Sequence, residues 1–398
     1  MDSQFSTADE AFRGEVRSFL NENLSEELRE AGRKKTSIWQ ENNSAMAWQK
    51  LLFDKGWAAP EWPAEYGGTD WSLTQRYIFS QECARAETPG ISPMGLKMCG
   101  PMLIGYGTEE QKNYYLPRIL SGEHIWCQGY SEPGAGSDLA SLKTFAGSDG
   151  DDYIVNGTKI WTSFAQHSNM MFALVRTSTE GKVQQGISFL LIDMATPGIK
   201  IEPIINLEGS HELNQVFFDD VRVPKANRVG KENDGWSVAK YLLEFERFSI
   251  SSIELRRLIN RTRCLANETV TTGNSLSSDP AFLKKLAQLE INALAMETSE
   301  QRVLANLSAG NRPGSVSSVL NAISAETLQK ADELAIEVAA YYGLPYQPVA
   351  LEVGGPSPIG SAITLPLMPS YMNNRMRTIA GGSAEVQRNI VAKAILEL

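Results

Sequence analysis

Apolar residues near the start of the chain recur every three or four positions, which predicts a helix with one buried face. These residues are Phe12, Val16, Phe19 and Leu20. Thr7 and Glu10 have the spacing of a capping box and are expected to open this helix. Thr108 and Gln111 form a second box, which predicts the start of another helix. The first third of the chain is therefore expected to be helical.

The pattern changes to short apolar runs at about residue 123. The segment 153–161 predicts a hairpin with Asn156-Gly157 at its turn. Further runs predict strands at 172–175, 187–192 and 215–218. We expect this β region to end near Gly230.

The helical period returns for the rest of the chain. Asp279 followed by Pro280 predicts the start of a helix that can extend to Gly310. A second long helix is expected from Ser317 to Tyr342, with Gly343 as its stop. Helices, then strands, then helices predict an α+β protein with segregated layers, not a doubly wound sheet.

A chain of 398 residues is long for a single hydrophobic core. The changes of pattern predict three domains: an N-terminal helical domain at 1–122, a central β domain at 123–232 and a C-terminal helical bundle at 233–398.

Composition excludes some classes of function. The chain carries 37 Lys and Arg against 47 Asp and Glu, a formal charge of −10. This balance argues against a nucleic-acid partner, which would require a basic face. It leaves room for an anionic ligand such as a coenzyme A thioester, provided that the site itself supplies N–H groups or an arginine.

The four cysteines and three histidines are scattered along the sequence. Scattered thiols argue against a disulfide framework, and isolated histidines argue against a metal site. The first ten residues are acidic and lack an apolar core, and no apolar run is long enough to span a bilayer. We therefore expect a cytoplasmic protein with no membrane insertion.

The segment Ser131–Asp138 is the strongest candidate for a ligand site. Gly134, Ala135 and Gly136 leave the main chain open to close approach, and successive N–H groups can surround a phosphate. The segment 159–163 follows with an indole and two hydroxyls. Together the two segments suit a flat ring with a phosphate tail, although a glycine-rich loop alone is more often a tight turn.

Five segments of the chain carry a family resemblance in their order and spacing. They are 56–68, 100–112, 131–138, 217–224 and 381–388. The whole chain resembles the acyl-CoA dehydrogenase family, with most likeness to the pimeloyl-CoA dehydrogenase large-subunit type. The resemblance implies an N-terminal helical domain, a central β domain and a C-terminal four-helix bundle.

The resemblance also implies an FAD site. The implied contacts are Gln128, Tyr130 and Ser131 beside the ring edge, Gly136 and Ser137 towards the pyrophosphate, Trp161 on one ring face, Thr162 and Ser163 as donors to the ring, and Ser383 and Glu385 at the nucleotide. Fixed donors stabilise the negative charge of a reduced flavin best where water is excluded. The alternative for Trp161 is an ordinary buried strand tryptophan.

A base is also required, because the proton next to a thioester is removed by a carboxylate in an apolar pocket. The position that carries this glutamate in many family members is Gly381 here. The family's second solution places the base at Glu246, and Leu242 and Ile250 lie four residues to either side on the same helix face. The alternative for Glu246 is a salt-bridged helix residue.

The expected substrate is an acyl-CoA. Its expected contacts are Ser137, Glu244, Arg247 and Gly381, where the main-chain N–H of Gly381 can polarise the thioester carbonyl. Glu244 and Arg247 are three residues apart, so an ion pair between them is the alternative.

The resemblance implies that electrons pass to an electron-transferring flavoprotein. An oxidase that uses oxygen is an alternative acceptor class, and a partner subunit without chemistry of its own is a second alternative. A homo- or hetero-oligomer is expected. The family segment that reaches a neighbouring subunit's FAD is replaced here by Arg261–Ala266, which lacks its phenylalanine and glycine.

Overall fold

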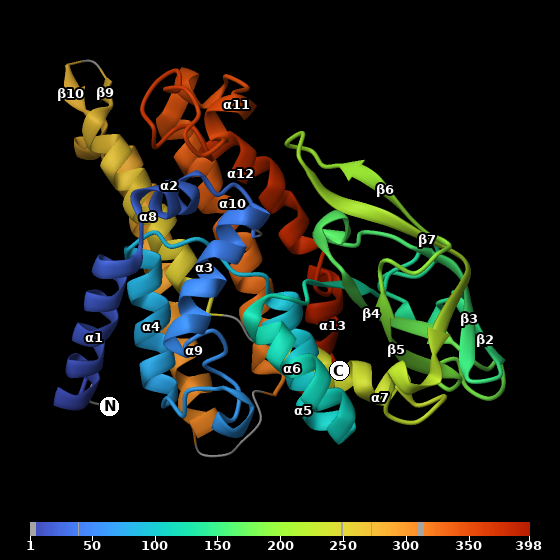
Figure 1. Cartoon of the computed structure of the whole chain (residues 1–398). Helices are drawn as coiled ribbons and strands as arrows, with labels where there is room; N and C mark the ends of the chain where they lie inside the picture. The colour runs from blue at the N-terminus through green and yellow to red at the C-terminus, as the bar shows by residue number, and fades with distance from the viewer. Residues whose placement is uncertain (1–4, 39, 248–249, 272, 309–313) are drawn as a thin grey trace. The chain divides into compact units, whose positions relative to one another are not determined.

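The computed structural model describes residues 5–38, 40–247, 250–271, 273–308 and 314–398; the side chains of 244–247, 271, 307 and 308 are outside this description. The chain divides into two compact units (Figure 1). The first unit comprises Met1–Trp48, Trp71–Ile91 and Arg247–Leu398, and the second comprises Gln49–Asp70 and Ser92–Glu246.

The first unit is built from helices. They are α1 (Thr7–Asn23), α2 (Glu26–Lys34), α4 (Leu73–Arg85), α8 (Ser252–Glu268), α9 (Pro280–Ser308), α10 (Val316–Ala339), α11 (Pro348–Leu351), α12 (Leu367–Asn373) and α13 (Ala384–Ala394). The helix α3 (Asn42–Lys55) is shared between the two units. A small hairpin of β9 (Val270–Thr271) and β10 (Asn274–Ser275) follows α8.

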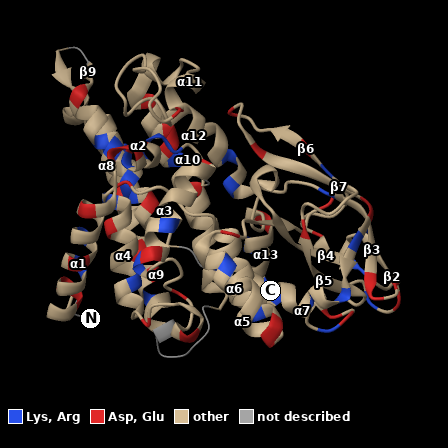
Figure 2. Ribbon diagram, in the orientation of Figure 1, with Lys and Arg blue, Asp and Glu red and all other residues tan. Residues whose placement is uncertain are grey.

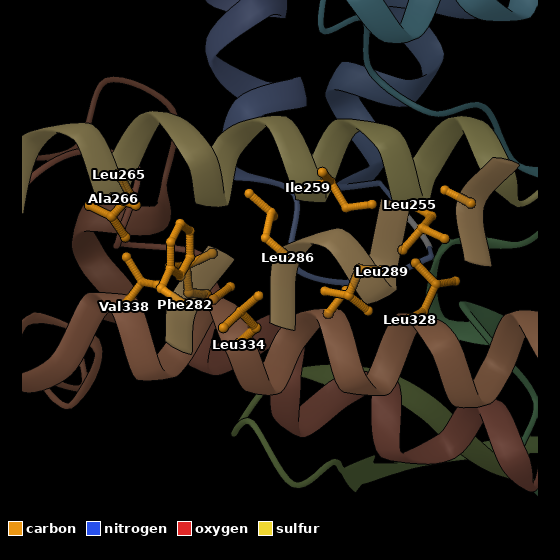
Figure 3. Close-up of a cluster of buried hydrophobic side chains, with 14 of the residues drawn as sticks. Leu255, Ile259, Leu265, Ala266, Phe282, Leu286, Leu289, Leu328, Leu334 and Val338 are labelled. Carbon is orange, nitrogen blue, oxygen red and sulfur yellow. The ribbon is translucent and has the colours of Figure 1, made fainter. Parts of the chain in front are cut away.

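Apolar faces of three long helices form the core of this unit. Figure 3 shows side chains of α8, α9 and α10 that point toward one another. Among them are Leu255, Ile259, Leu286, Leu289, Leu328 and Leu334. Burying a side chain of this size stabilises the fold by about 1.5–3 kcal/mol, so this shared face holds the bundle together.

The second unit combines a sheet with helices α5 (Gly100–Tyr106), α6 (Glu109–Ser121) and α7 (Gly235–Arg247). This unit ends at Glu246, one residue before the end of α7. A π-helical turn at Met94–Cys99 leads into α5. The aromatic rings of Tyr106 and Tyr241 meet edge to face at 5.2 Å and join α5 to α7. A side chain at Gly105 would collide with the ring of Tyr241, so glycine permits this close approach.

The sheet has the strand order β6-β7-β3-β2-β4-β5-β8, with β1 paired in parallel to β4. Its strands are β1 (Trp126–Gly129), β2 (Phe145–Asp149), β3 (Asp152–Lys159), β4 (Met170–Arg176), β5 (Ile187–Asp193), β6 (Ile199–Ile205), β7 (His211–Pro224) and β8 (Arg228–Val229). The three strands predicted from apolar runs are confirmed within β4, β5 and β7. Helices before and after this sheet confirm the predicted α+β class.

One of the two predicted capping boxes is shifted by one residue. Ser6, not Thr7, is the N-cap of α1, and its side chain and that of Asp9 close the box. Ser6 has the extended backbone that a cap requires, whereas Thr7 is already helical. The box of Thr108 and Gln111 at α6 is confirmed.

The predicted hairpin turn at Asn156-Gly157 is wrong. Both residues lie inside the strand β3, and the turn to β2 falls instead at Gly150-Asp151. Gly157 has φ +147°, and the pairing of β3 with β7 shifts register between Val155 and Gly157. The shift leaves Asp219 and Asp220 of β7 opposite the single residue Asn156, so the bulge lies in β7, beside the glycine.

The ends of the long C-terminal helices follow local chemistry. Asp279 accepts a hydrogen bond from the Phe282 N–H at 2.8 Å, which confirms the predicted start of α9. Its predicted limit, Gly310, lies outside the described residues. The helix α10 ends at Ala339, and a 3-10 turn then reaches Gly343.

No helix in the described ranges is both long and apolar enough to cross a membrane.

Candidate active site

The segment Ser131–Asp138 forms a tight loop in the second unit. Glu132 and Ala135 exchange two main-chain hydrogen bonds, at 2.9 and 3.0 Å. Gly134 and Gly136 are exposed, have no positive φ, and a Cβ built on either would meet nothing within 4 Å. Neither backbone strain nor crowding within the chain therefore requires glycine at these two positions, whereas a ligand resting on the loop would.

A buried ion pair holds this loop against the sheet. The Lys159 Nζ lies 2.8 Å from the Glu132 Oε1 and 3.2 Å from the Tyr130 carbonyl oxygen. The Glu132 carboxylate also accepts from the N–H groups of Lys143 and Thr144, at 2.6 and 2.9 Å. Burial lowers the pKa of Lys159 to about 8, against the opposing charge of Glu132. Sequence reasoning missed this pair, because two charged residues 27 positions apart give no local pattern.

The end of β3 brings Trp161 beside the loop. The Ile160 N–H donates to the Ser131 carbonyl at 2.9 Å, so the two segments are joined directly. Trp161 is 57% exposed and has φ +62°, which is rare for a bulky residue. The structure thus contradicts the buried-tryptophan alternative. A strained, exposed indole is a feature that surrounding structure must impose.

Asn214 of β7 fixes the backbone of Thr162, the residue after Trp161. Its carbonyl accepts from the Thr162 N–H, and its amide donates to the Thr162 carbonyl, both at 3.0 Å. Asn214 is fully buried and is fixed in turn by His211 and Gln166, at 2.7 and 2.6 Å. Ser163, next in the chain, is half-buried. Sequence reasoning did not identify Asn214 as a support of this segment.

Buried polar atoms without a hydrogen-bond partner among the described residues include the Thr162 Oγ1 and the Gln128 Nε2, both on residues predicted to contact the flavin. Leaving a buried polar group unsatisfied costs about 1–3 kcal/mol, so such atoms need an explanation. A polar ring edge offers donors and acceptors to such atoms, so the chemistry of these two residues fits a flavin.

Tyr130 differs from its expected surroundings. Its ring is buried and meets the rings of Phe172 and Phe189 edge to face, at 5.9 and 6.3 Å. The side chain thus belongs to the core of the sheet. Ser137 is exposed and Ser131 half-buried, so the hydroxyl groups of the loop are accessible.

The predicted C-terminal contacts lie in the first unit. Gly381 and Gly382 have φ +66° and +93°, a left-handed turn that leads into α13. Ser383 caps that helix by accepting from the Val386 N–H at 3.3 Å, and Glu385 stands in its first turn. A helix start with two preceding glycines can bind an anionic group.

A buried polar network precedes these glycines. The Asn374 amide donates to the Asp332 carboxylate at 2.8 Å, and Arg377 bridges Asn374 to Glu254, each at 2.6 Å. Burial raises the pKa of Asp332 to about 7, and Asn374 opposes the shift. The network ties α8 and α10 to the segment that leads to Gly381.

The helix that carries the predicted base is confirmed as α7, Gly235–Arg247. The expectation that Ile250 lies on the same helix face is wrong, because α7 ends before this residue. The side chains of Glu244, Glu246 and Arg247 lie outside the described residues, so their roles stay predictions. The next helix is fixed by the buried Glu300, which accepts from the N–H groups of Ser251 and Ser252 at 2.9 and 3.0 Å. This carboxylate caps the start of α8.

Arg261 forms an ion pair with Glu87. It lies within α8, and its guanidinium is 2.7 Å from the Glu87 carboxylate. The stretch that follows α8 is the small hairpin of β9 and β10. Arg261–Ala266 is therefore part of a helix and not of an extended connecting segment.

Three family models cover almost the entire chain. The N-terminal domain of acyl-CoA dehydrogenase matches residues 6–123, the middle domain matches 127–221 and the C-terminal domain matches 233–396. The chain belongs to the acyl-CoA dehydrogenase family. It is thus an oxidoreductase, and members of this family are flavoproteins.

Relatives match over nearly their full length. The acyl-CoA dehydrogenase IpdE1 of Mycobacterium tuberculosis is 36% identical, covering 98% of this chain and 97% of IpdE1. The acyl-CoA dehydrogenase FadE26 of the same organism is 32% identical, covering 98% of this chain and 96% of the relative.

Solved structures share the fold. The Tcur3481-Tcur3483 steroid ACAD has a TM-score of 0.86 and 28% identity, covering 100% of this chain and 99% of that one. The ChsE4-ChsE5 complex from Mycobacterium tuberculosis has a TM-score of 0.84 and 30% identity, with the same coverage. The second of these names denotes a complex.

Proposed function

We propose that this acyl-CoA dehydrogenase family member binds FAD and converts an acyl-CoA into its trans-2-enoyl-CoA. The observation that carries the proposal is the exposed, strained Trp161, joined to an open glycine loop and flanked by unsatisfied polar atoms. A rigid aromatic platform beside such donors suits a flat polar ring.

The chain supplies the cofactor site from several segments. Trp161 would lie on one face of the ring, and Gln128, Ser131, Thr162 and Ser163 would hold its polar edge. Gly136 and Ser137 would approach the pyrophosphate, Tyr130 would contribute only its main chain, and Ser383 and Glu385 would reach the nucleotide. When bound, FAD accepts a hydride from the β carbon of the thioester.

Glu246 is the proposed base that removes the α proton. Apolar neighbours on α7 raise the basicity of a carboxylate, because burial disfavours its charged form. Leu242, one helical turn earlier, is fully buried. Gly381 would polarise the thioester carbonyl through its N–H, and Ser137, Glu244 and Arg247 would orient the substrate.

We further propose that electrons leave through an electron-transferring flavoprotein in the bacterial cytoplasm, and that the chain works as a homo- or hetero-oligomer. The similar structure of the ChsE4-ChsE5 complex supports a mixed assembly. A mixed assembly allows a second candidate function, that of a partner subunit without independent activity. A colourless chain that becomes yellow only when co-expressed with a partner would favour this second function.

A panel of coenzyme A thioesters tests the proposal. It should include straight-chain, branched, dicarboxylic and sterol side-chain acyl groups, the last because one similar structure is named a steroid ACAD. Bleaching of the flavin absorbance by one class, with enoyl-CoA as product, is the expected result. Peroxide formation with and without a dye acceptor separates a dehydrogenase from an oxidase. A flavin-loaded protein that no thioester bleaches would contradict the proposal.

A further inference from the structure

The first unit contains a cleft of ≈ 1220 Å³. Its lining includes Arg261 and Cys264 of the stretch 261–266 but none of the residues proposed above as contacts to FAD or the thioester. It is bounded by α1, α2, α4 and α8 and by the stretch 355–366. Ligand sites commonly measure about 300–1,000 Å³, so the cleft has room for an organic molecule and not only for an ion.

The lining of this cleft is basic although the chain is acidic. Eight Lys and Arg side chains face five Glu side chains, an excess of three positive charges in a chain of formal charge −10. Figure 2 shows basic segments along α2 and α8. Such a local excess attracts anions.

Most of these basic groups are neutralised by a carboxylate. Arg256 lies 2.7 Å from Glu297, Arg17 lies 2.8 Å from Glu82, and Lys34 lies 2.7 Å from Glu30. The first two pairs join different helices, and the third lies within α2, so each has a structural role that needs no ligand. The excess of positive charge therefore comes from basic residues outside these pairs.

Arg257 is the exception at the wall of the cleft. It is half-buried, and its guanidinium donates to the Gly32 carbonyl at 2.5 Å. In the part of the chain that the structure describes, no carboxylate lies within ion-pair distance of it. Burial, together with the charge of Arg261 one turn along α8, lowers its pKa to about 10. The charges of Glu87 and Glu254 oppose this shift from beyond ion-pair distance, so the guanidinium keeps donors that no carboxylate occupies.

Arg85 is a second basic residue of the cleft for which the described residues offer no ion pair. It is the last residue of α4 and is exposed at the same cleft. Both groups therefore have donors available to a ligand.

We propose that this cleft binds an organic phosphate, with the phosphate on Arg257 and Arg85 and the organic part against an apolar wall. The planar fork of arginine matches phosphate oxygens two at a time, and a dianion matches the excess of charge. Ile253, Ile363 and Leu365 supply the apolar wall. The site is separate from the proposed flavin site and does not depend on it.

Calorimetric titration of the FAD-loaded protein with 1-naphthyl phosphate tests this site. Saturable one-to-one binding is expected, with weaker binding of inorganic phosphate and none of 1-naphthol. Arg257→Met should weaken binding at least tenfold, and Arg257→Lys should weaken it less because it keeps the charge. Arg222→Met is the matched control, because this exposed arginine pairs with Asp149 in the second unit and should leave binding unchanged.

Arg85→Ala keeps the test decisive if the Arg257 variants fail to fold. Arg85 is exposed, so its removal should weaken binding severalfold and leave dehydrogenase activity unchanged. Equal binding by parent, Arg257→Met and Arg85→Ala would overturn the proposal, as would equal affinity for 1-naphthol. Displacement of 1-naphthyl phosphate by coenzyme A would also overturn it, because the cleft would then belong to the substrate.

Discussion

The Lys159 ammonium and the Glu132 carboxylate form an ion pair of 2.8 Å between two buried side chains. The pair connects the glycine loop to the end of β3, the two segments that carry most of the proposed flavin contacts. Its position makes Lys159 and Glu132 positioning residues, since neither is accessible to a ligand.

Lys159→Met should lower the free energy of unfolding by about 3–5 kcal/mol, because it leaves the Glu132 carboxylate buried without a counter-charge. Urea denaturation of the FAD-free protein measures this. The double variant Lys159→Met/Glu132→Gln should be less destabilised than the single one. The exposed pair of Arg222 and Asp149 is the control, and its loss should cost less than about 1 kcal/mol. A Lys159→Met protein as stable as the parent would contradict the role given to this pair.

Gly134→Ala and Gly136→Ala should leave the folding of the FAD-free protein intact and weaken FAD binding. A Cβ at either position meets nothing in the chain itself but would project toward a ligand on the loop. Fluorescence titration with FAD measures the change. Gly14→Ala in α1 is a matched control, since it also meets nothing within 4 Å. Unchanged FAD affinity in both loop variants would show that the loop does not touch the cofactor.

Trp161→Asn should stabilise the FAD-free protein while weakening FAD binding. Asparagine adopts a left-handed backbone more readily, and the strain at such a position costs on the order of 1–3 kcal/mol. Trp161→Phe keeps an aromatic platform and should bind FAD more tightly than Trp161→Asn. Thermal unfolding and FAD titration together test this. Tight FAD binding by Trp161→Asn would argue that the indole has no part in the site.

The free energy of unfolding should decrease as the pH rises from about 4 to about 7, because of Asp332. Its pKa is raised to about 7 in the folded chain, while an unfolded aspartate titrates near 3.9. The folded state therefore holds the proton that the unfolded state loses, so ionisation favours unfolding as the pH rises, by at most about 4 kcal/mol. Asp332→Asn should remove this slope in urea denaturation measured across the range. An unchanged slope would show that Asp332 is ionised in the folded protein.

Sequence patterns predicted the parts of the site that are local in the chain. The glycine loop, the indole segment and the helix α7 follow from residue type and spacing, and each lies where it was expected along the chain. The α+β class follows in the same way, because the hydrophobic period changes between helices and strands.

Sequence patterns failed where contacts are distant or where one residue type has two uses. Asn214 supports Thr162 across 52 positions, which no local pattern encodes. Asn156-Gly157 suits a turn but also a strand opposite a bulge, and pairing with β7 placed it in the strand. Tyr130 could face a ligand or the core, and the rings of Phe172 and Phe189 fix it in the core. Tertiary packing decided each of these cases.

The central claim is that Glu246 removes the α proton. Anaerobic rapid mixing of the FAD-loaded protein with its acyl-CoA measures flavin reduction in one turnover, with Glu246→Gln compared against Glu244→Gln on the same helix. We expect Glu246→Gln to retain FAD and to slow flavin reduction by about 10²–10⁴, while Glu244→Gln changes it far less. Reduction by Glu246→Gln at the rate of the parent protein would contradict the claim.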